Sequence, residues 1–248
     1  MQQATGPRRL PMLIADSRTV LTDRTAMSMR TALVLALMNL GRDHVFMLAE
    51  EGEVDLVGVR EFLSAHGKHP FLVCGVTYLL WTCVYETARA HGLDLSQGTA
   101  LHGGGWKKLS DRAVDPAALR ERFRRDTGLR RIHDYYGMTE QGGTVFLEGP
   151  DGDGLYCPDF ADVIVRSPVT WEPLPVGTPG VLQVISTVPR AHPGHLLLTE
   201  DLGVVHGVDD GAWPGKRFSV LGRLPRAQAR GCSDTLTTDS TGAARNPS

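Results

Sequence analysis

Short apolar runs alternate with longer amphipathic segments along the first part of the chain. The runs predict strands at residues 10–14, 44–48, 71–76, 99–102 and 130–135, and the segments between them predict helices at 25–40, 54–65, 77–91 and 116–126. The run at 71–76 is continuously apolar, as expected of a strand covered on both faces. Strands that alternate with helices in this order predict an α/β fold with a mostly parallel sheet and flanking helices.

The pattern changes after residue 149, beyond which no helix is predicted. Short β runs follow at residues 162–165, 180–186, 195–199, 204–208 and 218–221, and turn-forming prolines and glycines separate them. Residues 233–248 are rich in Thr, Ser and Asp with almost no apolar side chains, so we expect them to be disordered. The predicted organisation is an α/β core at 1–150, a β-rich subdomain at 151–232 and a tail at 233–248.

Charge and hydropathy narrow the classes of function. The 248 residues include 26 Lys and Arg against 28 Asp and Glu, which gives a formal net charge of −2. This balance argues against nucleic acid as a main partner, because phosphate contacts require a clear basic excess. The most apolar stretch, residues 71–84, is too short and too interrupted for a membrane span, and the polar start of the chain carries no secretory signal. We therefore expect a soluble, cytoplasmic protein.

Two glycine-containing segments come directly after neighbouring predicted strands. The segment 136–140 reads Tyr-Gly-Met-Thr-Glu. The ring of Tyr136 can stack on a base, and Gly137 lets the backbone approach a ligand. Thr139 and Glu140 can bind a phosphate and its Mg²⁺. Residues 103–105 are three glycines whose backbone groups are open to a ligand. A tight turn with a buried Tyr136, and a flexible glycine loop, are the structural alternatives. Two such loops at strand ends favour a ligand site, because α/β proteins bind ligands at the carboxyl ends of strands.

Two charged residues of the second part could complete that site. Asp201 lies between two predicted β runs and could accept hydrogen bonds from ribose hydroxyls, although a turn aspartate is the alternative. Arg223 follows Gly222 and could contact a ribose or phosphate, with a solvated arginine as the alternative.

Together these segments resemble the motifs of the adenylate-forming enzymes. The segment 136–140 is similar to their Tyr-Gly-x-Thr-Glu motif, residues 199–202 to their Thr-Gly-Asp-Leu motif with Glu200 in place of Gly, and residues 222–223 to the Gly-Arg that begins their hinge. Within this superfamily, residues 102–107 (His-Gly-Gly-Gly-Trp-Lys) and 230–233 (Arg-Gly-Cys-Ser) look most like the acyl-protein synthetases of the fatty acid reductase complex linked to bacterial luciferase. The resemblance covers residues 6–234.

The resemblance implies part of an adenylate-forming large domain and a two-step reaction that uses ATP and Mg²⁺. A fatty acid carboxylate attacks the α-phosphorus of ATP to give acyl-AMP, and the acyl group then passes to an enzyme cysteine and on to an acyl reductase partner. Nucleotide and acyl group would both bind to the core at 1–150.

Residue roles follow from the same resemblance. The expected nucleotide contacts are Gly104 and Gly105 lining the adenine pocket, Tyr136 stacked on the base beside Gly137, Thr139 at the phosphate, Asp201 at the ribose and Arg223 at the nucleotide edge. Glu140 is expected to hold Mg²⁺, and Thr139, Glu140 and Cys232 are the expected catalytic residues.

Cys232 is the candidate acyl acceptor among four cysteines that form no Cys-x-x-Cys pair. The acylated cysteine of acyl-protein synthetases lies close to the C-terminus, and Arg230 could lower the pKa of this thiol. An incidental surface thiol is the alternative. Cys74 and Cys83 lie in apolar runs and are expected to be core residues, whereas Cys157, before Pro158 in a predicted loop, is a minor candidate.

One departure from the superfamily's pattern keeps other functions open, and a second fits the acyl-protein synthetases, which end near the hinge. Only residues 4–7 (Ala-Thr-Gly-Pro) resemble the end of the superfamily's phosphate loop, so the chain looks truncated at its N-terminus, and the separate C-terminal domain of acyl-CoA ligases is missing. An acyl- or aryl-CoA ligase of the phenylacetate type is one alternative. An inactive remnant that binds an adenylate is another.

Overall fold

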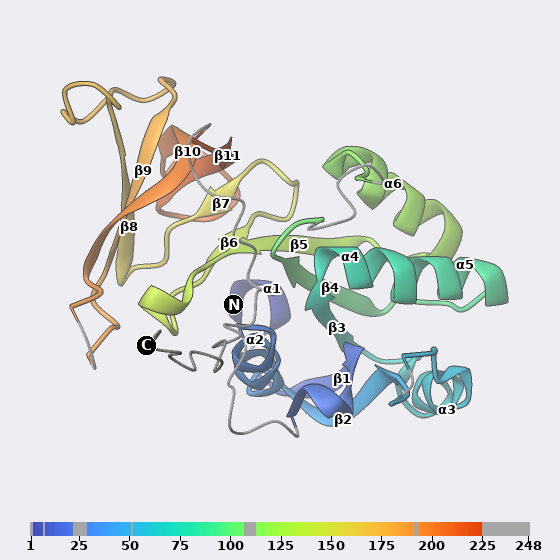
Figure 1. Cartoon of the computed structure of the whole chain (residues 1–248). Coiled ribbons are helices and arrows are strands. Elements are labelled where there is room, and N and C mark those ends of the chain that lie inside the picture. The colour runs from blue at the N-terminus through green and yellow to red at the C-terminus, as the bar shows by residue number, and fades with distance from the viewer. Residues whose placement is uncertain are drawn as a thin grey trace, which may run out of the picture.

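The computed structural model describes residues 2–6, 8–21, 29–50, 52–106, 113–190 and 193–224. Within them, 11 strands form one sheet in the order β2-β1-β3-β4-β5-β6-β7-β11-β10-β9-β8 (Figure 1). The strands are β1 (Leu10–Ser17), β2 (Gly41–Leu48), β3 (Phe71–Val76), β4 (Gly98–Gly103), β5 (Arg131–Tyr136), β6 (Phe146–Glu148), β7 (Leu155–Tyr156), β8 (Ala161–Arg166), β9 (Gly180–Ser186), β10 (Leu196–Val208) and β11 (Lys216–Arg223). The helices are α1 (Gln2–Thr5), η1 (Arg18–Leu21), α2 (Met29–Met38), α3 (Leu56–His66), α4 (Thr77–Leu79), the π-helix η2 (Leu80–Tyr85), α5 (Glu86–His91), α6 (Pro116–Thr127) and the 3₁₀ turn η4 (Thr139–Gln141).

The sheet is parallel in one part only. Strands β1 to β5 pair in parallel, which confirms the prediction for the α/β part of the chain. From the β5–β6 pair onward all pairings are antiparallel, so the expectation of a mostly parallel sheet holds for this first part alone. The reason lies in the connections: a parallel partner needs a crossover, usually through a helix, whereas β5 is followed only by η4 and a turn before β6.

Helices cover both faces of the parallel strands. Alternate residues of β1 show this, because Leu13 packs into the cluster formed with α3, η2, α5 and α6, while Met12 and Ile14 pack into the cluster formed with α2. Figure 1 shows α4, α5 and α6 along one face. This three-layer arrangement leaves the carboxyl ends of β3, β4 and β5 at one common edge.

The antiparallel strands enclose a third apolar cluster. It contains Phe146 of β6, Val163 of β8 and Phe218 of β11, so strands from both ends of this part contribute to one core. The antiparallel part must therefore curve around that cluster. Strand β10 runs unbroken from Leu196 to Val208, where the sequence predicted two strands.

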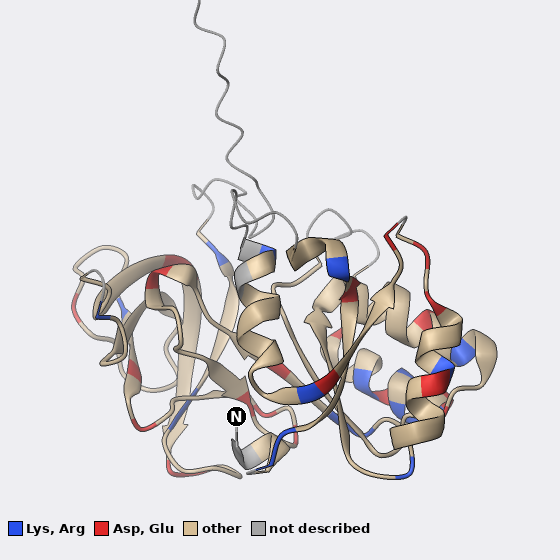
Figure 2. Ribbon diagram, turned by 90° about the horizontal axis from the view of Figure 1, so that it is seen from below, with Lys and Arg blue, Asp and Glu red and all other residues tan. Residues whose placement is uncertain are grey.

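The surface carries mixed charge, and none of the described helices is long and apolar enough to cross a membrane. Figure 2 shows Lys and Arg interspersed with Asp and Glu along the ribbon, with neither sign confined to one part of the fold.

Candidate nucleotide site

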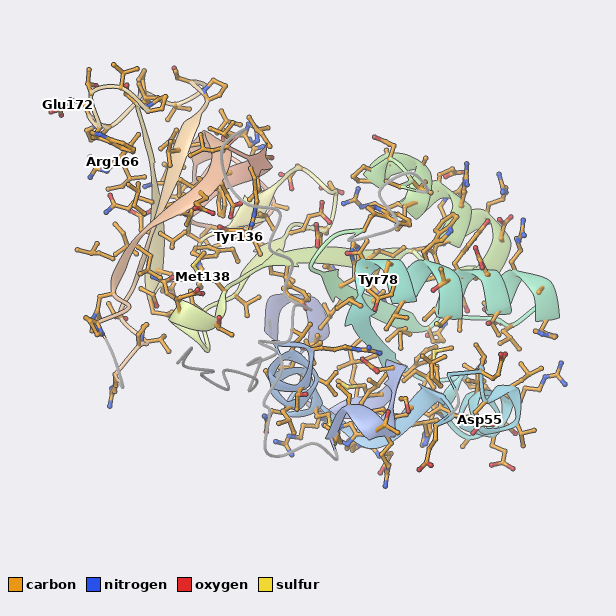
Figure 3. All side chains as sticks on the ribbon, viewed as in Figure 1. Asp55, Tyr78, Tyr136, Met138, Arg166 and Glu172 are labelled. Carbon is orange, nitrogen blue, oxygen red and sulfur yellow. The ribbon has the colours of Figure 1, made fainter. Side chains whose placement is uncertain are left out.

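Three residues from separate strands meet between the parallel and antiparallel parts of the sheet. Tyr136 is the last residue of β5, and its hydroxyl donates a hydrogen bond of 2.7 Å to Oδ2 of Asp201 on β10. Asp201 is paired in register with Arg223 of β11, whose Nε lies 3.6 Å from Asp201 Oδ1. Figure 3 labels Tyr136 between the two parts. The fold thus brings together three residues that the sequence placed in three different motifs.

Strand β10 holds Asp201 through an irregularity rather than a turn. The hydroxyl of Thr199 donates to the carbonyl of Leu182 at 2.8 Å, and the backbone N–H of Asp201 donates to Thr199 Oγ1 at 3.1 Å. The pairing of β10 with β9 shifts register between Leu198 and Leu202, across this same segment. The side chain of Thr199 therefore substitutes for a regular ladder bond, and the strand continues through a segment that looks like a turn in the sequence.

The surroundings of Tyr136 keep its phenol protonated. Partial burial raises the pKa of Tyr136, and the carboxylate of Asp201 raises it further. Its ring centroid lies 6.1 Å from that of Phe146 and 6.3 Å from that of Phe218, so the side chain is supported by the third core cluster. Tyr136 is consequently a fixed hydrogen-bond donor with a partly exposed ring.

The glycine loop, residues 103–105, leaves β4 beside the end of β5. Gly103 is paired in register with Tyr135, and a Cβ on Gly103 would lie 2.7 Å from the Tyr135 ring. Gly104 and Gly105 follow with φ values of +77° and +65°, which L side chains rarely adopt. Both are exposed, so their backbone groups are open to a ligand. The loop and the Tyr136 segment lie on neighbouring strands, as the sequence predicted.

The segment after β5 presents Thr139 and Glu140 to solvent. Gly137 follows the strand directly, and a Cβ there would approach the carbonyl of Thr144 to 3.1 Å. Thr139 and Glu140 open η4, and Thr139 Oγ1 donates to Glu140 Oε2 at 3.1 Å. The buried Gln141 anchors this turn by donating from Nε2 to the carbonyl of Gly194 at 2.9 Å. Exposed hydroxyl and carboxylate oxygens are suitable ligands for Mg²⁺, which usually takes one or two carboxylates together with substrate phosphates.

A buried polar cluster that no sequence motif indicates lies behind the glycine loop. The hydroxyl of Thr77 donates to the carbonyl of Gly103 at 3.1 Å and lies 3.1 Å from Nδ1 of His102. Nδ1 of His102 is also 3.6 Å from Oδ1 of Asp134. Burial, together with the nearby Arg120 and His133, lowers the pKa of His102 to about 3. The available signal was the position of Thr77 directly after the buried strand.

The expected acyl acceptor Cys232 and its neighbour Arg230 lie outside the described residues. The three described cysteines, Cys74, Cys83 and Cys157, are all buried. Burial raises the pKa of each of their thiols, that of Cys157 to about 12. None of these three is poised to form a thiolate near neutral pH.

A known protein family matches most of the chain. The model of the family described as acyl-protein synthetase, LuxE, matches residues 1–241. The long-chain-fatty-acid–luciferin-component ligase of Vibrio harveyi is 24% identical over 213 residues, and the chain spans about half of its length, since the match covers 82% of this chain and 54% of that protein.

Solved structures of similar fold are adenylate-forming enzymes. A 2-hydroxyisobutyryl-CoA ligase matches with a TM-score of 0.63 and 16% identity, over 90% of this chain and 47% of that chain. The long-chain-fatty-acid-CoA ligase of Archaeoglobus fulgidus matches with a TM-score of 0.59 and 16% identity, over 90% and 46%. The amide bond synthetase McbA of Marinactinospora thermotolerans matches with a TM-score of 0.58 and 19% identity, over 90% and 43%. These likenesses show that the chain has the fold of part of these enzymes.

Proposed function

The chain belongs to the acyl-protein synthetase family LuxE, and on this premise we propose that it activates a fatty acid with ATP and passes the acyl group to its own Cys232. The observation that carries the proposal is the contact of Tyr136, Asp201 and Arg223 next to the glycine loop, because it joins the three motif segments into one site. The glycine loop at the end of the neighbouring strand supplies the remaining wall.

Each group of the site has a role that its chemistry supports. The partly exposed ring of Tyr136 stacks on adenine, and the backbone of Gly104 and Gly105 borders the base. The carboxylate of Asp201 accepts hydrogen bonds from the ribose hydroxyls, and Arg223 supplies positive charge at the nucleotide edge. Because Tyr136 donates to Asp201, the carboxylate is already oriented before the nucleotide binds, which lowers the entropic cost of binding.

Formation of the acyl-adenylate depends on alignment and charge neutralisation. A fatty acid carboxylate is a weak nucleophile, so the site must hold it in line with the α-phosphorus and offset the charge of the phosphates. Thr139 and Glu140 would hold Mg²⁺, which supplies that neutralisation when bound. In this step the carboxylate oxygen bonds to the α-phosphorus and pyrophosphate leaves.

The second step transfers the acyl group to Cys232. The thiolate attacks the acyl carbonyl, a carbon–sulfur bond forms, the bond from the acyl carbon to the AMP oxygen breaks, and the thiol proton passes to solvent. Arg230, two residues away, would favour the thiolate by lowering the pKa of Cys232. The resulting thioester is a suitable donor for an acyl reductase partner.

The nucleotide site is tested by replacing Asp201 with Asn, which keeps the shape of the side chain and removes its charge. We expect ATP affinity, measured by calorimetric titration, to fall about tenfold or more, because hydrogen bonds to a charged acceptor are worth ~1.5–3 kcal/mol. The matched control is Asp153→Asn, since Asp153 accepts a 2.6 Å bond from Tyr156 and lies 3.7 Å from Arg217 in an analogous trio. Unchanged ATP affinity in a folded Asp201→Asn protein would contradict the assignment.

A further inference from the structure

The residues of the glycine loop make few contacts that could fix the conformation of its backbone. Gly104 and Gly105 are exposed and adopt consecutive left-handed conformations, and a Cβ on Gly105 would meet no atom within 4 Å. Glycine is the residue that loses most conformational freedom when it is ordered. The loop must therefore be held where it leaves β4, at Gly103.

Gly103 is held at two points. A Cβ on it would lie 2.7 Å from both the ring and the carbonyl oxygen of Tyr135, so the backbones of β4 and β5 are in close approach there. On the helix side, the carbonyl of Gly103 accepts the hydroxyl proton of Thr77, the first residue of α4. Thr77 is buried, with an exposed fraction of 5%, so water does not compete effectively for this bond.

The orientation of the Thr77 hydroxyl is determined by His102. A threonine hydroxyl carries one proton, and here that proton is donated to Gly103. Nδ1 of His102, 3.1 Å from Thr77 Oγ1, must then carry a proton and donate it to the hydroxyl oxygen. Asp134 Oδ1, 3.6 Å from the same nitrogen, favours this tautomer electrostatically. A single chain of donors thus runs from His102 through Thr77 to the start of the loop.

We propose that Thr77 is a positioning residue of the nucleotide site: its hydroxyl, oriented by the Nδ1–H of His102, fixes the carbonyl of Gly103 and with it the path of Gly104 and Gly105. This inference rests on the proposed function for its consequence in ATP binding, but the tether itself is independent of any ligand. Thr77 touches no substrate in this account and acts only through the loop backbone.

The test compares Thr77→Val, which removes the hydroxyl at similar volume, with Thr77→Ser, which keeps it. We expect Thr77→Val to raise the KM for ATP about tenfold, the factor that ~1.4 kcal/mol represents, with a smaller change in kcat. Deuterium exchange of the backbone amides in residues 101–106 should accelerate in Thr77→Val and stay at the wild-type rate in Thr77→Ser. If Thr77→Val does not fold, Thr77→Ala is measured in its place with the same expectation.

Thr127→Val is the matched control for general destabilisation. Thr127 is also buried, and its hydroxyl donates to the carbonyl of Phe123 at 2.7 Å within α6, away from the loop. This variant should lose stability without changing the KM for ATP or the exchange of residues 101–106. Wild-type exchange rates and KM in Thr77→Val, or equal effects from Thr127→Val, would overturn the inference. Failure of the wild-type chain to bind ATP would instead refute the proposed function, and the amide exchange would still decide whether the tether exists.

Discussion

Single side chains set the electrostatics of the candidate site. Tyr136 remains a hydrogen-bond donor because burial and the carboxylate of Asp201 raise its pKa. Asp201 is oriented because it accepts the hydrogen bond from Tyr136 and faces Arg223. The chain repeats this trio in Tyr156, Asp153 and Arg217 elsewhere on the sheet. Such a trio can therefore be purely structural, and the nucleotide proposal rests on the Asp201 trio lying next to the glycine loop.

The buried ring of His102 predicts a specific dependence of stability on pH. Its pKa is about 3 in the folded chain, so between the ordinary histidine value of ~6.5 and that value the unfolded chain binds a proton that the folded chain does not. The free energy of unfolding contributed by His102 is therefore fully present above pH ~6.5 and is lost as the pH falls below it.

The difference in the free energy of unfolding between wild type and His102→Gln isolates the contribution of His102. Burial and the neighbouring Glu148 raise the pKa of Asp134, which acts in the opposite direction, and neither of these causes is removed by replacing His102. Urea unfolding should show the stability difference shrinking by about 2 kcal/mol between pH 7 and pH 5. Parallel pH profiles for the two proteins would show that His102 titrates normally.

At the scale of elements, strand β10 shows how a break in the sequence pattern places a residue of the candidate site. The polar segment 199–201 breaks the apolar alternation, so the sequence predicts two separate strands, with a turn aspartate as one interpretation of Asp201. In the fold, the hydroxyl of Thr199 bonds to Leu182 and to the backbone of Asp201, and the strand continues. Thr199 is therefore expected to place Asp201 without touching a ligand.

Replacing Thr199 with Val tests this role. Loss of the two hydroxyl bonds should cost about 1–2 kcal/mol of stability in urea unfolding. It should also weaken ATP binding, because Asp201 loses the bond that fixes its backbone. Thr199→Ser keeps the hydroxyl and should restore both properties. A Thr199→Val protein that is destabilised but binds ATP normally would show that the irregularity does not position Asp201.

Helices and strands with a clear hydrophobic pattern could be predicted from the sequence. Very short strands and features that depend on pairing with distant residues could not. The continuous apolar run at 71–76 coincides with β3, and the helical pattern at 77–91 covers α4, η2 and α5. The π-helical stretch within it has no sequence pattern of its own. Strands β6 and β7, with three and two residues, are too short to show an alternation.

The site was predicted as motifs but not as contacts. Tyr136 and Asp201 are 65 residues apart, and spacing does not reveal that they share a hydrogen bond. The motif resemblance placed both at a nucleotide, and the fold shows how β5, β10 and β11 bring them together. Thr77 and Asp134 were missed because a lone threonine or aspartate near a strand end is common and only the packed fold shows what it contacts.

At the scale of the whole molecule, the chain has one continuous sheet whose two parts meet at the candidate site. The match with the Vibrio harveyi ligase covers 54% of that protein, so the activity of this chain has to be measured on this chain itself. The acyl-transfer half of the proposal depends on Cys232 and can be separated from the adenylation half.

Covalent labelling tests the acyl acceptor. Incubation with ATP and a radiolabelled fatty acid should label the wild-type chain through a thioester that hydroxylamine cleaves. Cys232→Ser should lose the label, because it lacks the thiolate, whereas Cys157→Ser should keep it, because Cys157 is buried and its thiol is protonated. Wild-type labelling of Cys232→Ser would place the acyl group on another residue.

The central claim is that this chain makes an acyl-adenylate. The most direct measurement is the exchange of labelled pyrophosphate into ATP by the purified, folded chain, with and without each of a panel of fatty and aromatic acids. We expect exchange that requires a fatty acid and Mg²⁺ and that falls in Asp201→Asn but persists in Cys232→Ser. Absence of exchange with every acid from a well-folded wild-type protein would contradict it and would favour an inactive adenylate-binding protein.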